Sequence, residues 1–218
     1  MLATGGDAKL VQLWLLPVTP PTGRVLGPPA WRFLCKTNIQ SVAIHPAGDL
    51  LAVGTSSEHT EVYSLRIQDP AQLFCEPLML VPCSAHAGAV AFARVGYRLL
   101  IGGNSTVMLV DVHSGVTLRK YERHGRVHTV ALGPDGGLCA IGGFDRLVSV
   151  VDSVGGASVT AHTGEVVVVR SVHRSSSSSL LAVAGDAPQG AGVVQARTPS
   201  ICNRTQTNSG WPARSSVV

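Results

Sequence analysis

The chain has 218 residues, of which 45% are hydrophobic and 14% charged, so it is long and apolar enough to bury a core. Its formal net charge of +4 is too small for this length to predict nucleic-acid binding by itself. The five cysteines form no CxxC pair, which argues against a zinc site or a disulfide framework and favours free thiols in a reducing compartment.

The beginning of the chain, "MLATGGDAKL", lacks the basic segment and long apolar run of a secretory signal. No apolar run approaches the ~18 residues that a membrane-spanning helix needs. We therefore expect a cytoplasmic protein, with the nucleus as an alternative, that is neither secreted nor membrane-spanning.

The first predicted element begins at Leu2 with "LATGGDAKLVQLWLL", in which two apolar runs flank a glycine pair and a turn. Similar segments begin at Leu50, Leu99, Leu138 and Leu180. The second position of each glycine pair falls at Gly6, Thr55, Gly103, Gly143 and Gly185, in steps of 49, 48, 40 and 42 residues. A step of ~40–45 residues is the period of a four-stranded propeller blade.

The segments before these units repeat as well. "IQSVAIHPAGDLL" begins at Ile39, "GAVAFARVGYRLL" at Gly88 and "GRVHTVALGPDGGL" at Gly125. Each reads as an alternating apolar strand, a turn and a second strand. Histidines precede three of the units, in steps of 38 residues, at His86, His124 and His162. These patterns predict an all-β protein of repeated antiparallel sheets.

One unit carries a specific resemblance. Residues 114–152, "SGVTLRKYERHGRVHTVALGPDGGLCAIGGFDRLVSVVD", resemble the repeat of the WD-repeat β-propeller family. Asp145 matches the family's turn aspartate, and Val151 stands where the family has tryptophan. In the first unit, Trp14 matches that tryptophan. The resemblance covers roughly residues 1–197, and it implies a propeller.

The resemblance also implies a hydrogen-bonded His, Ser/Thr, Asp and Trp set that stiffens a blade, and here the set is never complete. The unit with His124 and Asp145 has Ile141 at the Ser/Thr position and Val151 at the tryptophan position. The first unit has Ala8 at the turn-aspartate position. We therefore expect blades that depend on apolar packing and are only marginally rigid.

We expect about four to five four-stranded blades within residues 1–197, with the first and last incomplete. Residues 17–29 are a predicted proline-rich connector, and residues 198–218 a disordered tail. Because Leu2 already opens the second strand of a blade, we expect an incomplete or open ring that belongs to a longer propeller. A small closed ring is the alternative.

No motif predicts catalysis. The glycine pairs lack the lysine of a phosphate loop, and strands follow them where a dinucleotide fold needs a helix. Neither HExxH nor GxSxG occurs. We expect no enzyme activity, no cofactor and no metal. The repeated positions of His86, His124 and His162 favour structural roles, and His45 before Pro46 is expected to be a solvated turn residue.

One stretch is densely basic. "LRKYERHGRVH" holds the candidate partner-binding residues Arg119, Lys120, Arg123, Arg126 and His128. The resemblance implies a non-catalytic scaffold that binds peptide segments of other proteins through propeller loops and helps assemble a multiprotein complex. One alternative is a module that binds phosphoinositide or RNA through residues 119–128. Another is the substrate-receptor arm of a ubiquitin ligase. The missing blades of a longer chain are a further candidate partner.

Overall fold

The structure is a computed structural model that describes the backbone of residues 1–16, 27–69, 72–83, 86–133, 136–153, 158–162, 168–174, 181–186 and 192–197. Side chains are described up to residue 153, with the same gaps and without residue 69, and beyond that only at Val168. Most of the predicted connector and all of the predicted tail lie outside these ranges. Every regular element within them is a β-strand, so the predicted all-β architecture is confirmed.

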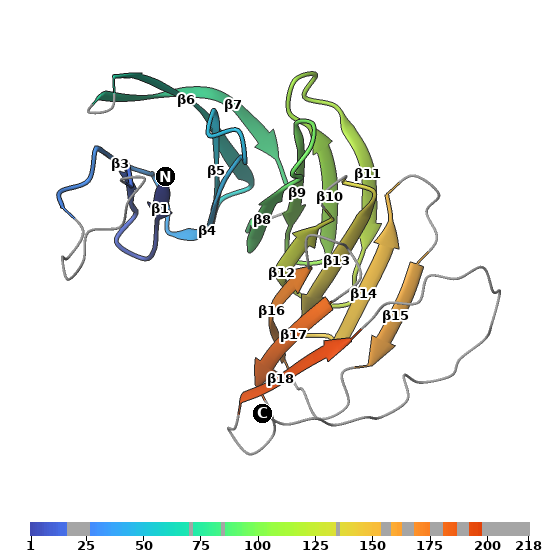
Figure 1. The fold of residues 1–218 in the computed structure, drawn as a ribbon. Coiled ribbons are helices and arrows are strands. Elements are labelled where there is room, and N and C mark those ends of the chain that lie inside the picture. The colour runs from blue at the N-terminus through green and yellow to red at the C-terminus, as the bar shows by residue number, and fades with distance from the viewer. Residues whose placement is uncertain are drawn as a thin grey trace.

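The strands form five antiparallel sheets in chain order (Figure 1). The first contains β1 (Leu2–Thr4), β2 (Leu10–Trp14) and β3 (Trp31–Leu34). The second contains β4 (Ile39–Ile44), β5 (Leu50–Thr55), β6 (His59–Asp69) and β7 (Gln72–Pro82). The third contains β8 (Ala89–Phe92), β9 (Arg98–Gly102), β10 (Thr106–Asp111) and β11 (Thr117–Glu122).

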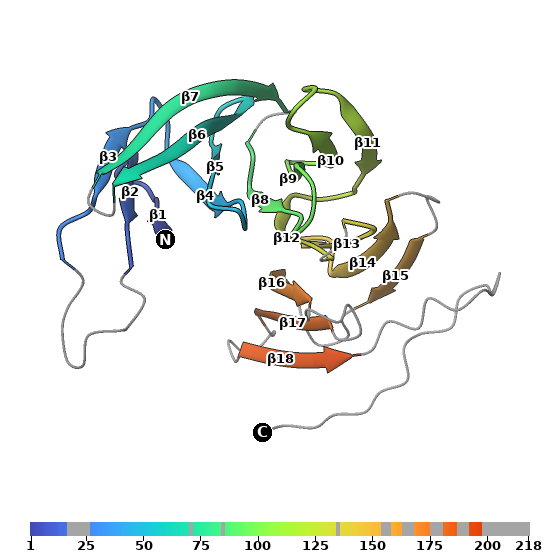
Figure 2. The same cartoon turned by 45° about the horizontal axis from the view of Figure 1, so that its top comes forward.

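The fourth sheet contains β12 (Val127–Leu132), β13 (Leu138–Gly143), β14 (Leu147–Asp152) and β15 (Ser158–His162). The fifth contains β16 (Val168–Arg174), β17 (Leu181–Asp186) and β18 (Gly192–Arg197). Figure 2 shows the sheets following one another around a common centre, with β4, β8, β12 and β16 nearest to it. The described strands do not close a ring, which agrees with the expected open arc.

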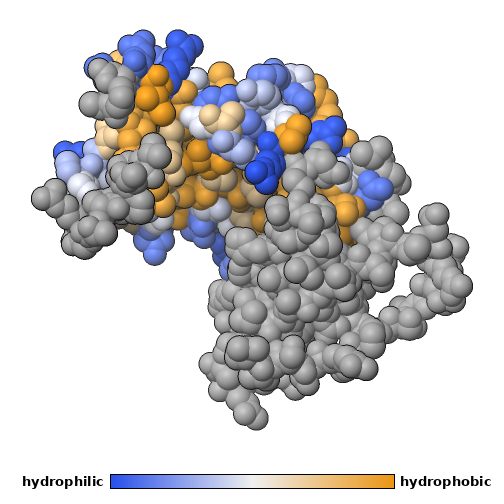
Figure 3. All heavy atoms as spheres, viewed as in Figure 1, coloured by the Kyte–Doolittle hydropathy of each residue, from blue (hydrophilic) through white to orange (hydrophobic). Residues whose placement is uncertain are grey.

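Three apolar clusters fill the spaces between the first four sheets. Strand β9 shows how the alternation of side chains serves two of them. Leu99 and Ile101 belong to the cluster against the second sheet, and Leu100 to the cluster against the fourth. The middle strands are therefore buried on both faces, which explains their continuous apolar runs. In the space-filling view, apolar side chains gather in the middle of the coloured part and many hydrophilic ones lie along its edge (Figure 3).

Three of the innermost strands, β4, β12 and β16, share a β-bulge at equivalent positions. In β4 the register shifts between Ile39 and Ser41, so Gln40 is the extra residue. In β12 it shifts between Val127 and Thr129, which makes His128 the extra residue. Strand β16 carries the same shift. Because a bulge turns a side chain away from the regular pleat, these positions are free to point side chains at the end of the sheet.

The glycine pairs mark places where neighbouring segments approach closely. A Cβ at Gly54 would lie 2.8 Å from the Ala87 carbonyl oxygen, at the entry to the next sheet. A Cβ at Gly143 would overlap the carbonyl group of Arg126. At Gly6, the equivalent position of the first unit, a Cβ would meet nothing within 4 Å. Gly54 and Gly143 are thus a packing requirement of the fold, and Gly6 is not.

Because of this difference, replacing glycine with alanine should affect stability strongly at Gly143 and weakly at Gly6. Gly143→Ala should lower the free energy of unfolding by about 2 kcal/mol or more, because rigid backbone would have to move. Gly6→Ala should change it by less than about 1 kcal/mol. Urea unfolding followed by circular dichroism measures both. Equal effects of the two substitutions would contradict the close approach at Gly143.

Candidate partner-binding face

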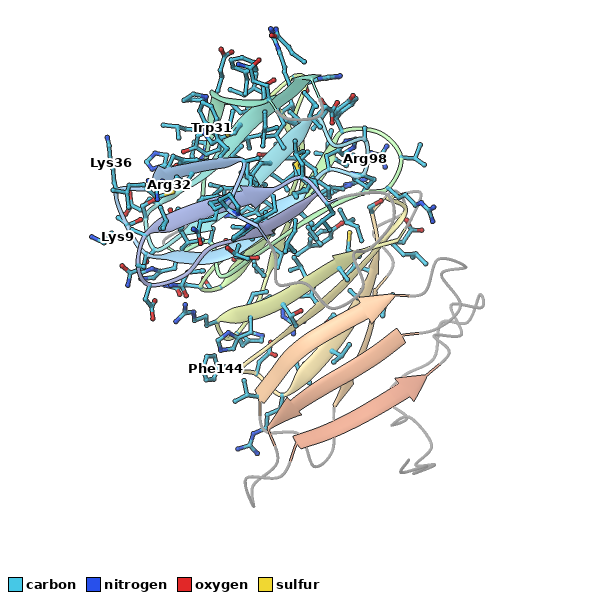
Figure 4. All side chains as sticks on the ribbon, turned by 60° about the vertical axis from the view of Figure 1, so that its left-hand side comes forward. Lys9, Trp31, Arg32, Lys36, Arg98 and Phe144 are labelled. Atoms are coloured by element: carbon cyan, nitrogen blue, oxygen red, sulfur yellow. The ribbon has the colours of Figure 1, made fainter. Side chains whose placement is uncertain are left out.

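One end of the sheets carries a continuous set of turns and loops, held together by backbone hydrogen bonds. The amide of Ile39 donates to Gly6 at 3.3 Å, and that of Ser56 donates to Asn38 at 2.9 Å. The amide of Val127 donates to Gly103 at 3.0 Å. We call this end the loop face, and it comprises residues 5–9, 35–40, 56–58, 86–88, 103–105, 123–128 and 143–146. Figure 4 shows Lys9, Lys36 and Phe144 along this side and Arg98 on the opposite side.

The structure separates the predicted basic stretch into three places. Arg119 and Lys120 lie on β11, the outermost strand of the third sheet, rather than on the loop face. Lys120 forms an exposed ion pair with Glu122 at 3.1 Å. Arg119 donates from Nε to the Ser153 carbonyl at 3.4 Å, which connects β11 to the fourth sheet. These two residues therefore do not form a single patch with Arg126.

Arg123 lies inside the blade and is not available to a partner. Its side chain is 8% exposed and that of Asp145 is 7% exposed, and Arg123 Nη2 lies 2.8 Å from Asp145 Oδ2. The guanidinium also donates to the Leu147 carbonyl at 3.2 Å and to the hydroxyl of Ser149. This differs from the expected partner-binding role, because Asp145 and these oxygen acceptors draw the guanidinium inward.

His124, in contrast, is exposed. The residue that contacts the turn aspartate is therefore Arg123, one position earlier than the expected histidine. The sequence contains a signal for this, since Arg123 precedes Gly125 by the same two positions that separate His86 from Gly88.

Arg126 and His128 do reach the loop face. Arg126 Nη2 donates to Gln40 Oε1 at 3.1 Å across 86 positions of sequence, joining the entries to β12 and β4. The ring of His128 packs on Phe144 with centroids 4.4 Å apart. Phe144 is 47% exposed and its amide donates to the Arg126 carbonyl at 3.0 Å. The two bulge residues, Gln40 and His128, thus each contact a residue of another loop.

The remaining predicted repeat positions are occupied in different ways. His86 lies in the loop before β8 with a positive φ of 62°, and its amide donates to Ser57 at 3.1 Å. Trp14 ends β2, and its indole Nε1 donates at 3.0 Å to the carbonyl of Gly27, near the end of the predicted connector. His162 ends β15 opposite Leu147, and its side chain lies outside the described part of the chain.

A polar cluster at the opposite end of the sheets was not predicted. His45 is 5% exposed rather than solvated, with Nδ1 2.8 Å from Asp49 Oδ1 and Nε2 3.1 Å from the Gly96 carbonyl oxygen. Tyr97 donates its hydroxyl to Asp49 Oδ2 at 2.6 Å. The Tyr97 ring stacks between those of His45 and His113, at centroid distances of 4.7 and 4.1 Å. The cluster joins the second and third sheets.

The cysteines within the described residues form no disulfide, and Cys35 and Cys75 are poorly suited to nucleophilic chemistry. Burial raises the pKa of the Cys75 thiol to about 11. Burial, together with the nearby Glu61, raises the pKa of the Cys35 thiol to about 12. Both thiols stay protonated at neutral pH, and the protonated form is a weak nucleophile. Cys202 lies outside the described residues.

The Asp49 cluster predicts a dependence of stability on pH. Burial opposes ionisation of Asp49, but hydrogen bonds from Tyr97 and His45 outweigh it and lower the pKa of this carboxyl below its usual range. The resulting stability is present above the unfolded-state pKa of roughly 4 and is lost as pH falls through the lower folded-state value. Asp49→Asn should therefore lower stability at pH 7 and flatten its decline below pH ~4. Urea unfolding at a series of pH values measures this, and an unchanged acid profile would contradict it.

The buried ion pair predicts a sharp contrast between two adjacent residues. Arg123→Ala should lower the free energy of unfolding by about 3 kcal/mol or more, because Asp145 would stay buried without its partner. His124→Ala should change it by no more than about 0.5 kcal/mol. Thermal and urea unfolding provide the comparison. A larger loss of unfolding free energy in His124→Ala than in Arg123→Ala would contradict this prediction and indicate that His124 is the stabilising residue.

Residues 115–152 match the family described as WD domain, G-beta repeat. No match was found among curated proteins. Among the described side chains, no group of three or more His, Cys, Asp or Glu residues is placed to hold a metal ion. Nor does the described part of the chain contain a helix long and apolar enough to cross a membrane. The matched segment runs from the Gly115 turn through β11 of the third sheet and β12, β13 and β14 of the fourth. Residues 115–152 are therefore a WD repeat, and the antiparallel sheets of the described residues are consistent with a WD-repeat β-propeller that they leave unclosed.

Proposed function

We propose that this chain is a non-catalytic interaction scaffold of the cytoplasm or nucleus. It binds peptide segments of other proteins on its loop face and helps assemble a multiprotein complex. WD repeats generally mediate protein–protein interaction and scaffolding. The observation that carries the proposal is the Arg126–Gln40 bridge beside the exposed ring of Phe144.

The supports of this region are buried. Arg126 lies three residues after the buried Arg123 and directly before Val127, which is 1% exposed at the start of β12. Phe144 directly precedes Asp145, which Arg123 holds. Side chains that are placed before binding lose little conformational entropy when a partner arrives. Loops on a rigid scaffold are the usual location of binding residues.

The alternative of phosphoinositide or RNA binding through residues 119–128 has less support. Its cations do not converge, since Arg119 and Lys120 lie on an outer strand and Arg123 is buried. A phosphate group is recognised best by donors that converge on it. Tyr121 is half-buried on β11, so it offers no stacking platform for bases. No observation favours a ubiquitin-ligase arm over other scaffolds.

Photo-crosslinking tests the loop face directly. A photoreactive phenylalanine analogue replaces Phe144 in the full chain, and a matched variant carries it at Leu80 on β7, which is 61% exposed. We expect discrete protein adducts from position 144 that are absent from position 80. The captured protein is then purified and its affinity for the chain measured. Equal adducts from both positions, or no binding on reconstitution, would contradict the proposal.

A further inference from the structure

Three described residues other than glycine have a positive φ, and all three are of basic type. They are Lys9 at 60°, His86 at 62° and Arg146 at 59°. All three lie on the loop face, in the β1–β2 turn, the loop before β8 and the β13–β14 turn. Side chains with a Cβ rarely adopt this conformation, and glycine adopts it without strain.

Lys9 and Arg146 occupy equivalent positions, each three residues after the second glycine of its unit. Two separate turns therefore hold a long cationic side chain where glycine would be less strained. Strain that is kept at one surface is better explained by function than by folding. Both side chains are exposed, and that of Lys9 points away from the molecule (Figure 4).

We infer that the loop face binds an acidic peptide segment along a cationic strip of Lys9, Lys36, Arg126 and Arg146, with Phe144 contacting an apolar side chain of the peptide. This inference rests on the proposed scaffold function and specifies its partner. The carboxylates of the peptide pair with the cations, and the apolar contact fixes its register.

The strip is continuous across the loop face. The amide of Cys35 donates to the Lys9 carbonyl at 2.8 Å, which places the neighbouring Lys36 beside the β1–β2 turn. The Ile39–Gly6 hydrogen bond connects this turn to β4, where Gln40 accepts from Arg126. The Phe144 amide bonded to Arg126 completes the route to the fourth sheet. An extended chain can follow this path past the entry to β8.

The charges of the loop face favour an acidic ligand. Its exposed acidic side chains, within the described residues, are Asp7 and Glu58. Asp145 is neutralised by Arg123. Arg126 donates from Nη2 to Gln40 in an exposed contact, whereas its Nε is buried and does not face a ligand, so the peptide would meet the terminal nitrogens of the guanidinium. Arginine is the cation best suited to a planar carboxylate.

The spacing of the strip favours a peptide over other anions. Its cations come from separate turns of the first and fourth sheets and from the entries to β4 and β12. They do not converge on one phosphate group, as a lipid headgroup would need. Single-stranded RNA binds through several stacked aromatic rings, and Phe144 is the sole exposed Phe, Tyr or Trp in the described part of the loop face.

Fluorescence anisotropy with a defined probe tests the inference. The probe is a short fluorescein-labelled peptide of glutamate and serine with one central leucine, titrated with the full chain. A second peptide replaces each glutamate with lysine. We expect the acidic peptide to bind, with affinity that falls as salt rises, and the basic peptide not to bind. Lys9→Gly and Arg146→Gly should each weaken binding roughly threefold, and Phe144→Ala roughly tenfold.

The glycine variants separate binding from folding. Because glycine relieves the strain of the positive φ, Lys9→Gly and Arg146→Gly should keep or raise the melting temperature while weakening binding. Arg94→Ala, an exposed cation in the β8–β9 turn at the opposite end, is the matched control and should leave binding unchanged. An equal loss of peptide affinity in Arg94→Ala, or no loss in Arg146→Gly, would contradict the inference that the cationic strip binds the peptide.

Two further outcomes would also overturn it. One is equal binding of the basic peptide. The other is binding of polyuridine or of vesicles containing phosphatidylinositol phosphate when the acidic peptide fails to bind, which would assign the face to the anionic-ligand alternative. If the crosslink from position 144 instead identifies a peptide without acidic residues, the strip fails while the scaffold function stands.

Discussion

Each sheet of this protein has to approach the next one closely enough for its second strand to contact the entry to the neighbour's innermost strand. A Cβ at Gly102 would lie 2.6 Å from the Val127 side chain, and one at Gly54 would lie 2.8 Å from a backbone carbonyl oxygen. Only a small residue fits at these positions, and the strands that carry it are apolar on both faces. The glycine pairs and apolar runs that repeat along the chain are direct consequences of this packing.

Polar contacts add to the packing in a different way in each unit. In the fourth sheet, Arg123 and Asp145 form a buried ion pair that also engages Ser149. Between the second and third sheets, Asp49 accepts hydrogen bonds from Tyr97 and His45. A buried polar network specifies one arrangement when its members find partners. The incomplete set of family residues is therefore partly replaced by contacts specific to this sequence.

The repeated features of the fold could be predicted from the sequence, because period and turn residues are local signals. The individual contacts could not. Arg123 and His124 are adjacent and both basic, and only the position of Gly125 shows which of them faces Asp145. The basic stretch looks continuous in sequence, but β11 and the following loop direct its side chains to different places. The stack of His45, Tyr97 and His113 joins residues far apart in sequence, which periodicity does not reveal.

The residues that build the blades are distinct from those that the blades display. Arg123 and Asp145 pair with each other, His45 contacts Asp49 and the Gly96 carbonyl oxygen, and little of these three side chains reaches solvent. Lys9 and Arg146 add strain to turns of the first and fourth sheets, which selection for folding alone would remove with glycine. A peptide that contacts both turns holds the first and fourth sheets in one arrangement. Its binding free energy then adds to the stability of an arc whose described strands do not close on themselves.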